Sequence, residues 1–485
     1  MFNRFKKEIS DQKNEIRKKL GGVNGKQMSA LLLVFDSISR YRLERNLPKT
    51  TKCLKELKDN EEFDDTFEFY DFDKTPVPEP VPRTVSNMAQ MLYGKTWEEI
   101  SAIYGSSDRL LKDKVYLKHQ TKAIWTHFSK LGYVTMFSHN TVLDYLTFLF
   151  GQIINTDHVL TNIWKYFWSV FNIHDKEDGK KCVGNRHIND FSLDYTYQFF
   201  DNYPDNHKFA YVHMNAALEN TRNAKTIDED LIRFLTKYLR MIKSNGENLA
   251  LLLLSDHGHK ILKGAEWDYR TFYEINTPAT FFIISKEVVK KLNADENLRN
   301  NEGQLVSRFD INLSLKHLAY FPYNVSLAKE VYTYKNTVSL FQEKAFANRT
   351  CSQIGIQRTS CLCSKFLPVK PSEKQNIING ELIKIFSTYL TTAKITKKSC
   401  KIEESIGSSK VLSFPLKEQN EGADTLYKLE ITTVGGLRIV VEFNFCLKAK
   451  IDKSKLILTA ENRPSSSFLI KKEMYFVQLS SISIP

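Results

Sequence analysis

The sequence lacks any long uninterrupted apolar run. No stretch reaches the roughly 18 consecutive apolar residues that a membrane-spanning helix needs, so we expect no transmembrane segment in this chain. Hydrophobic residues make up 42% and charged residues 26% of the 485 residues, which is ordinary for globular proteins and excludes a largely disordered chain. This length suggests two or three domains with a large buried core.

An apolar leader is also missing. The first twenty residues, MFNRFKKEISDQKNEIRKKL, are charged, and no signal peptide is visible in them. Two interpretations stay open, namely a cytosolic protein or a sequence that omits its true N-terminus. Sequons at Asn312, Asn324 and Asn348 favour the second interpretation, because these acceptors are used in secreted proteins.

No signature of nucleic-acid binding accompanies the positive net charge. The formal net charge is +13, but the excess of Lys and Arg is spread along the chain. A spread excess is typical of a solvated basic surface, so we predict no nucleic-acid partner.

Cysteine is scarce in the first two thirds of the chain. Five of the seven cysteines lie between Cys351 and Cys446, without the C-x₂-C spacing or the neighbouring histidines of a zinc ribbon. Disulfides are therefore the expected use of these thiols if the compartment is oxidising.

What the sequence does contain is a set of apolar runs that alternate with amphipathic stretches, from Gln27 to about Pro322. Continuous apolarity marks strands buried on both faces, so the pattern predicts an α/β/α sandwich with a mainly parallel sheet. The predicted strands are Met28–Phe35, Tyr133–Phe137, Phe209–Val212, Leu249–Leu254 and Ala279–Ile284. The predicted helices are Ser37–Arg45, Thr84–Leu92, Asp228–Lys243 and Asp310–Tyr320.

The character of the chain changes after about Ser372. Gly435 and Gly436 separate two apolar runs, which predicts a hairpin in a small β-rich domain, with further strands at Leu456–Thr459 and Met474–Leu479. We therefore expect a charged N-terminal extension over residues 1–26, the α/β domain over 27–370 and the β-rich domain over 371–485.

Acids follow two of the predicted strands directly. Asp36 follows Met28–Phe35, and Asp256 with His257 follows the strand that ends near Leu254. Ligands in open α/β sheets bind beyond the carboxyl ends of strands, and carboxylate with imidazole suits zinc or manganese. Thr84 starts a predicted helix, where a hydroxyl lies at the anion-attracting end.

Several motifs together resemble a known family. They are Asp36-Ser37-Ile38-Ser39-Arg40, Leu47-Pro48-Lys49-Thr50, Thr84-x-x-Asn87 with Gly94, and Ser255-Asp256-His257-Gly258. Over roughly Met28 to Cys363 the chain resembles the domain of unknown function 229 family, within the alkaline phosphatase and sulfatase superfamily. The spacing of Cys351, Cys361 and Cys363 also resembles that family.

The resemblance implies a chemistry for these residues. Asp36, Thr84, Asp256 and His257 correspond to the ligands of one divalent metal, zinc or manganese, and Thr84 to the nucleophile. It therefore implies hydrolysis of phosphate or sulfate esters, with glycans or lipids as candidate substrates, by an extracellular or membrane-associated protein. A sulfatase proper is less well supported, because the Cys/Ser-x-Pro-x-Arg motif that yields formylglycine is absent.

The chain also departs from the family pattern. Where ligands for a second metal are expected, it has Leu218 and Glu219 after one strand and His139-Asn140 after another. Glu219 and His259 are kept as possible ligands, while the other histidines, among them His213, are interpreted as core or surface residues. The alternative function is therefore a catalytically silent secreted or surface binding protein with the same fold.

Overall fold

The fold is described from a computed structural model. Its described residues are 3–21, 26–78, 83–104, 123–140, 155–161, 182–183, 186–215, 223–259, 269–323, 332, 334–357, 360–362, 367–368, 406–414, 424–433, 438–446, 458–460, 475–477 and 479–482. The chain divides into two compact units, Met1–Leu362 and Cys363–Pro485. All the predicted site residues belong to the first unit.

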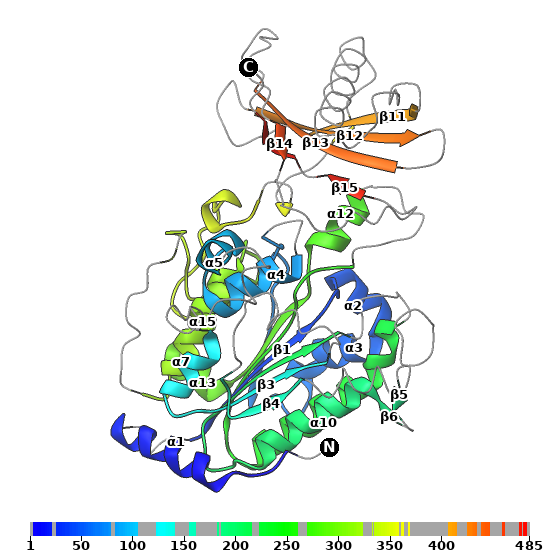
Figure 1. The fold of residues 1–485 in the computed structure, drawn as a ribbon. Coiled ribbons are helices and arrows are strands. Elements are labelled where there is room, and N and C mark those ends of the chain that lie inside the picture. The colour runs from blue at the N-terminus through cyan, green and yellow to red at the C-terminus, as the bar shows by residue number, and fades with distance from the viewer. Residues whose placement is uncertain are drawn as a thin grey trace. The chain divides into compact units, whose positions relative to one another are not determined.

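The first unit is built on a seven-stranded sheet (Figure 1). Its strands lie in the order β2 (Phe67–Asp71), β9 (Thr280–Ser285), β8 (Asn248–Ser255), β1 (Met28–Phe35), β7 (Lys208–Met214), β3 (Val134–His139) and β4 (His158–Leu160). The five from β8 to β4 are parallel, whereas β9 is antiparallel to both β8 and β2. The predicted mainly parallel sheet is confirmed with all five predicted strands, and the two missed strands lie at its edges.

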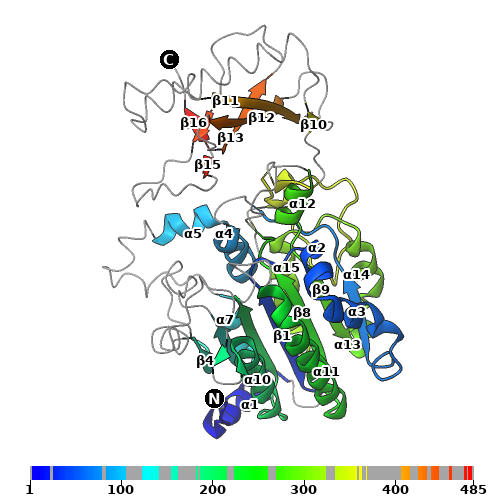
Figure 2. The ribbon, with the colours of Figure 1, turned by 90° about the vertical axis from the view of Figure 1, so that its right-hand side faces the viewer.

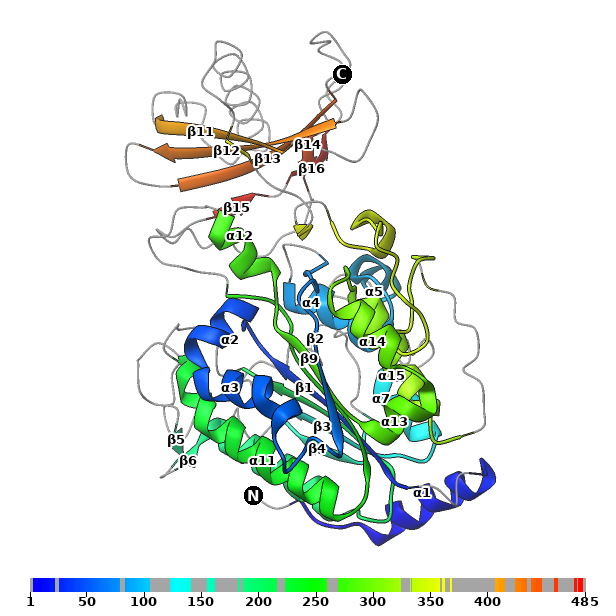
Figure 3. The ribbon, with the colours of Figure 1, turned by 180° about the vertical axis from the view of Figure 1, so that it is seen from behind.

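Helices cover both faces of this sheet, because both faces are apolar. Every residue of β1 is buried, and its side chains alternate between two separate cores: Met28, Ala30, Leu32 and Val34 in one, Leu31, Leu33 and Phe35 in the other. The first core includes residues of the helices Arg83–Met88, Ile124–Lys130, Lys286–Leu292, Asp295–Glu302 and Arg308–Tyr320, and the second includes residues of the helices Arg40–Asn46, Pro48–Glu56, Ile188–Asp201 and Asp228–Ser244. Figures 2 and 3 show these layers from the side and from behind.

The helices of the first unit follow the predicted pattern, with some additions. They are α1 (Lys7–Lys19), α2 (Arg40–Asn46), α3 (Pro48–Glu56), α4 (Arg83–Met88), α5 (Trp97–Tyr104), α7 (Ile124–Lys130), α10 (Ile188–Asp201), α11 (Asp228–Ser244), α12 (Tyr269–Asn276), α13 (Lys286–Leu292), α14 (Asp295–Glu302) and α15 (Arg308–Tyr320). Shorter turns are η1 (Leu57–Asp59), η2 (Ala89–Tyr93, a π turn that continues α4), η4 (Asn223–Ile227) and η5 (Ser352–Ile354).

The predicted start of the second helix at Ser37 is wrong. Ser37 has a φ of 64°, in the left-handed region, and α2 begins only at Arg40. Ser39 is its N-cap, since the Ser39 hydroxyl accepts a hydrogen bond of 2.9 Å from the Arg42 amide. Asp36 is therefore not the helix cap, and its carboxylate is left for another role.

The charged start of the chain is a helix that docks through polar contacts. In α1 the Ser10 hydroxyl donates to Asn206 Oδ1 at 2.7 Å, and Arg17 donates to the Asp205 carbonyl at 2.9 Å. These contacts join α1 to the loop between α10 and β7, so residues that the sequence placed in an extension belong to the first unit.

The second unit is β-rich, as predicted. A sheet contains, in order, β10 (Leu367–Pro368), β11 (Ile406–Phe414), β12 (Asp424–Thr433), β13 (Arg438–Cys446) and β15 (Tyr475–Val477), while β14 (Leu458–Ala460) pairs with β16 (Leu479–Ile482). The predicted hairpin is β12 and β13, which pair antiparallel. In the first unit, β5 (Cys182–Val183) and β6 (Arg186–His187) form a further small pair.

The structure also shows how two of the cysteines are used and whether two of the three sequons are exposed. Cys351 and Cys361 form a disulfide, as expected for this cluster. Asn312 is buried in α15, where its Nδ2 donates to the Met91 carbonyl at 2.8 Å, so this sequon does not accept a glycan in the folded chain. Asn348 is exposed, and Asn324 lies outside the described residues.

Within the described ranges, each helix is too short or too polar to cross a membrane.

Candidate metal centre

Two buried carboxylates meet at the carboxyl edge of the sheet. Phe35 of β1 pairs with Ser255 of β8, so Asp36 and Asp256 leave neighbouring parallel strands at the same level. The Asp256 amide donates to the Phe35 carbonyl at 3.1 Å, which fixes this register. Asp36 is 4% exposed and Asp256 is fully buried. Two acids in one dry site repel each other unless a cation or protons compensate them.

The turn at Ser37 holds both carboxylates. The Ser37 amide donates to Asp256 Oδ1 at 3.0 Å, and the Ser37 hydroxyl donates to Asp36 Oδ1 at 2.6 Å. Its left-handed φ of 64° turns the amide toward Asp256 rather than into a helix. The turn therefore orients one oxygen of each acid.

Asp256 keeps one oxygen unsatisfied. Its Oδ1 also accepts from the His257 amide at 2.7 Å, but Oδ2 is buried and accepts no hydrogen bond within the part of the chain that the structure describes. Burial raises the pKa of the Asp256 carboxyl well above its usual range and the charge of Asp36 raises it further, while the Ser37 amide, the nearby Thr84 hydroxyl and the His257 amide oppose the rise. A bound cation would relieve both penalties.

His257 presents a lone pair to this group. Its Nδ1 lies 2.7 Å from the Gly258 carbonyl, which can only accept, so Nδ1 carries the proton and Nε2 does not. Nε2 lies 3.4 Å from Asp256 Oδ2, 3.7 Å from Asp36 Oδ1 and 3.0 Å from Thr84 Oγ1. The fold thus brings Asp36, Thr84, Asp256 and His257 together from three distant segments.

Thr84 reaches this group from α4. Pro76 and Pro78 lie in the irregular segment between β2 and α4, and Gly94, with a φ of 64°, ends the helical segment at η2. The Thr84 hydroxyl can donate to His257 Nε2, since that nitrogen is unprotonated. Among the described residues, Thr84 is the hydroxyl that contacts Nε2 of His257, the nitrogen that faces the two acids.

A further histidine, which was interpreted as a core or surface residue, also lies here. His213 of β7 pairs with Val34 of β1, and one donor atom each of His213, Asp36 and Asp256 lies within 4.8 Å of the other two. Burial lowers the pKa of His213 well below its usual range, and His139 lowers it further, so the ring is neutral at pH 7. His213 directly follows the predicted strand Phe209–Val212, just as Asp36 follows Met28–Phe35, so its position at a strand end was a signal that could have identified it.

The other residues that the sequence singled out differ in their surroundings. His139 packs against His213 with ring centroids 4.9 Å apart, while Asn140 donates to Asn189 at 2.9 Å and accepts from the Asn215 amide at 2.6 Å. His259 is 6% exposed and so does not point into solvent. Leu218 and Glu219 lie outside the described residues, so Glu219 remains a prediction.

Two buried arginines hydrogen-bond to groups next to the two carboxylates. Arg308 donates to Asn87 Oδ1 at 2.9 Å and to the Ser255 carbonyl at 2.7 Å, and Arg42 donates to the Ser37 carbonyl at 2.8 Å. Burial lowers the pKa of each to about 10, so both stay charged at neutral pH. Their charges favour the ionised forms of Asp256 and Asp36.

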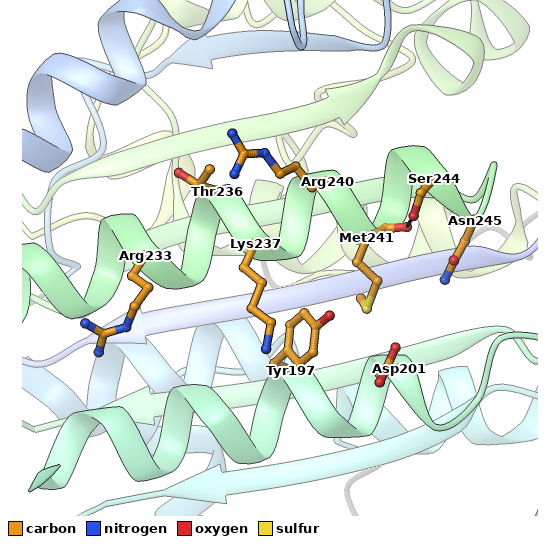
Figure 4. A pocket seen from close by; sticks show the side chains of 9 residues that line it. All are labelled: Tyr197, Asp201, Arg233, Thr236, Lys237, Arg240, Met241, Ser244 and Asn245. Carbon is orange, nitrogen blue, oxygen red and sulfur yellow. Dashed lines mark hydrogen bonds between the residues drawn. The ribbon is translucent and has the colours of Figure 1, made fainter.

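A surface groove of about 770 Å³ lies over α10 and α11, apart from these residues (Figure 4). Its cations already have partners: Lys237 lies 3.6 Å from the centre of the Tyr197 ring, and Arg240 pairs with Glu62. None of its lining residues belongs to the group around Asp36. We therefore place the candidate site at the sheet edge and not in this groove.

The chain is similar to one protein family and to several solved structures. The family described as "Protein of unknown function (DUF229)" matches residues 3–405. The comparison with curated proteins finds no match. A similar solved structure is the C-terminal periplasmic domain of EptC from Escherichia coli in complex with Zn, with a TM-score of 0.43 and 14% identity, covering 69% of this chain and 97% of that one.

Two further solved structures show similar values. The lipoteichoic acid synthase LtaP from Listeria monocytogenes has a TM-score of 0.38 and 12% identity, covering 74% of this chain and 83% of that one. A protein in the alkaline phosphatase superfamily from Vibrio parahaemolyticus has a TM-score of 0.39 and 10% identity, covering 96% of this chain and 92% of that one.

Proposed function

The chain belongs to the DUF229 family, as its motifs indicated, and from the geometry of its candidate metal centre we propose that it is a metal-dependent hydrolase of phosphate or sulfate esters. Thr84 is the proposed nucleophile. The observation that carries the proposal is the 3.0 Å contact between Thr84 Oγ1 and His257 Nε2, beside two buried carboxylates. A hydroxyl in contact with an imidazole is an arrangement found in enzymes that use a hydroxyl as a covalent nucleophile.

The residues present fit a divalent cation. Asp256 Oδ2 is buried without a donor among the described residues, and His257 Nε2 carries a lone pair 3.4 Å from it. Asp36, Asp256, His257 and Thr84 would hold the ion, and this mixture of oxygen and nitrogen suits zinc or manganese. When bound, such an ion lowers the pKa of a neighbouring hydroxyl and neutralises charge on the group being transferred.

The chain's own groups then perform a two-step displacement. The Thr84 oxygen loses its proton and attacks phosphorus or sulfur, and the bond to the substrate's alcohol oxygen breaks, so the alcohol leaves with a proton. Water then attacks the same centre, which restores the Thr84 hydroxyl and releases phosphate or sulfate. Before an ion is bound, His257 Nε2 holds the Thr84 hydroxyl in place, and Arg308 favours the ionised form of Asp256.

We place the substrate among the esters of extracellular glycans or lipids. The disulfide between Cys351 and Cys361 and the exposed sequon at Asn348 support an oxidising compartment outside the cytosol. The phosphate or sulfate group is the part of the substrate that the candidate centre itself would recognise.

Turnover of aryl esters tests the proposal. The purified chain, supplied with zinc or manganese, is assayed with an aryl phosphate and an aryl sulfate, alongside Thr84→Ala, Thr84→Ser and Thr196→Ala. Thr196 is a matched control, since it is a buried threonine in α10 whose hydroxyl donates to the Ser192 carbonyl at 2.7 Å. We expect Thr84→Ala to lose at least about 10³-fold in kcat, Thr84→Ser to keep part of the activity and Thr196→Ala to keep nearly all of it.

The rival function is a binding protein of the same fold without turnover. It is favoured by Asn140, which is committed to Asn189 and to the Asn215 amide where an acid for a second metal was expected. Metal binding without turnover of either ester would decide for the rival, whereas turnover that Thr84→Ala leaves unchanged would contradict the role of Thr84 as nucleophile.

A further inference from the structure

We propose that His213 is an additional nitrogen ligand of the metal, and that the Tyr211 hydroxyl and the Met88 sulfur fix the tautomer that allows it to bind. This inference rests on the proposed function, because it concerns the same ion. It adds a donor outside the set of Asp36, Thr84, Asp256 and His257. That donor comes from the opposite side of the two acids.

The sheet order places two imidazoles on either side of the carboxylates. β1 lies between β7 and β8, so Asp36 has His213 on one flank and His257 on the other. His213 pairs with Val34, one residue before the end of β1. One donor atom of His213 lies within 4.8 Å of donor atoms of both Asp36 and Asp256, so a single ion between these groups is within reach of all three after small side-chain movements.

The unprotonated nitrogen of His213 can be assigned from its neighbours. The Tyr211 hydroxyl lies 3.3 Å from Met88 Sδ and 2.9 Å from His213 Nδ1. Because the thioether has no proton, the Tyr211 hydroxyl donates to sulfur and accepts from Nδ1–H. The lone pair of His213 is therefore on Nε2, which is the arrangement that a second-layer hydrogen bond gives to metal-binding histidines.

Nε2 of His213 has no other visible role. It is buried without a hydrogen-bond partner among the described residues, and His213 as a whole is 1% exposed. His158 of the same sheet, by contrast, contacts the Tyr203 hydroxyl through Nε2 at 2.8 Å. A buried lone pair close to two carboxylates is available to a cation.

The surroundings of Tyr211 make it a positioning residue. Its ring packs against Trp125 and Phe137, with centroids 6.2 and 5.2 Å away, which fixes the position of the ring and hence of the hydroxyl oxygen. Met88 lies on α4, the helix that carries Thr84. The hydrogen bond to sulfur thus ties the His213 tautomer to the element that presents the nucleophile.

A second imidazole ligand would also limit which divalent cations the site prefers. Two nitrogens with carboxylate and hydroxyl oxygens match zinc, or manganese as a weaker binder, whereas an oxygen-only set would favour magnesium or calcium. We therefore expect the full-length chain to bind zinc much more tightly than magnesium.

Calorimetric titration of zinc into the whole chain, and the visible absorption of its cobalt(II) form, test the inference. The variants are His213→Gln, Tyr211→Phe and Asp256→Asn, with His158→Gln as a matched buried histidine that also contacts a tyrosine. We expect His213→Gln to weaken zinc binding about 10- to 100-fold and to alter the cobalt spectrum, Tyr211→Phe to weaken binding about 10-fold, and His158→Gln to change neither.

The outcomes separate this inference from the proposed function. If the unaltered chain binds zinc and Asp256→Asn abolishes binding while His213→Gln binds normally, the inference is overturned and the proposed function stands. If the unaltered chain binds no zinc, both are wrong. Should His213→Gln fail to fold by circular dichroism, the ¹⁵N resonances of histidine in the unaltered chain decide. A proton on Nδ1 and a zinc-dependent shift of Nε2 support the inference, and an unshifted Nε2 refutes it.

Discussion

The backbone at Gly258 lies against the Glu274 carbonyl so closely that a Cβ on Gly258 would stand 1.8 Å from that oxygen. The Gly258 amide also donates to the Ile275 carbonyl at 2.9 Å. The loop that carries Asp256 and His257 is thereby held to α12 by two backbone contacts that leave no room for a side chain. Glycine at this position is a steric requirement of the candidate centre.

Gly258→Ala should therefore displace the loop. We expect a loss of about 2 kcal/mol or more in the free energy of unfolding, measured by urea denaturation, together with weaker zinc binding. Gly303→Ala is the control, since nothing lies within 4 Å of a Cβ there and its φ is −93°. A Gly258→Ala variant as stable as Gly303→Ala would contradict the close approach.

His158 should make the stability of the fold depend on pH. Burial, together with the charge of Lys6, lowers the pKa of His158 from 6.5 to about 4, with Asp157 opposing. Between these two values the unfolded chain binds a proton that the folded chain does not, so stability falls as the pH drops from 6.5 to 4. The full effect is about 3 kcal/mol.

Urea denaturation at pH 7.0, 5.5 and 4.5 measures this effect. In His158→Gln the contribution is absent, so its loss of stability on acidification should be smaller than that of the unaltered chain by up to about 3 kcal/mol. Other buried histidines contribute equally to both proteins and cancel in the difference. Parallel pH profiles for the two proteins would refute the assignment.

The sequence predicted the centre of the sheet and most of the candidate site, because both depend on strong local patterns. β1 and β8 are continuous apolar runs, and Asp36 and Asp256 follow them directly. The edge strands escaped prediction for physical reasons. β2 reads FEFYD and mixes acids with aromatics, and β4 has only three residues, so neither shows the apolar run of a buried strand.

Other features depend on contacts that are distant in the sequence. The left-handed turn at Ser37 is stabilised by the Asp256 carboxylate, 219 residues away, and no local pattern indicates it. His213 was interpreted as a core or surface residue, and its proximity to Asp36 depends on the pairing of β7 with β1, which the sequence does not show. The helix α1 docks through the polar side chains of Ser10 and Arg17. Polar contacts of this kind produce no apolar periodicity, so the sequence did not predict the docking.

The sequons should differ sharply in glycan occupancy. When the chain is expressed behind a secretion leader in a eukaryotic cell, peptide mass spectrometry should find glycan on Asn348, which is exposed, and none on Asn312, which is buried in α15. Asn348→Gln should then remove the corresponding mass. Glycan on Asn312 would mean that α15 is not folded as described when the chain is modified.

Removal of metal should weaken the fold through the paired acids. With zinc at about 100 times its Kd, binding stabilises the folded chain by about 2.7 kcal/mol, and a chelator should abolish that gain as a fall in Tm. Without a cation, burial and Asp36 disfavour the ionised form of Asp256. Asp256→Asn should therefore be at least as stable as the unaltered chain in the presence of chelator, yet gain nothing from zinc.

Scanning calorimetry of both proteins with zinc and with chelator distinguishes the two effects. An amide keeps the size of the carboxylate and removes its charge, so Asp256→Asn isolates the electrostatic cost from packing. The Thr196→Ala variant, altered within α10, should retain the full zinc-dependent gain. If the Tm of the unaltered chain were the same in zinc and in chelator, the two carboxylates would have to be explained without a metal, and the proposed hydrolase would lose its principal support.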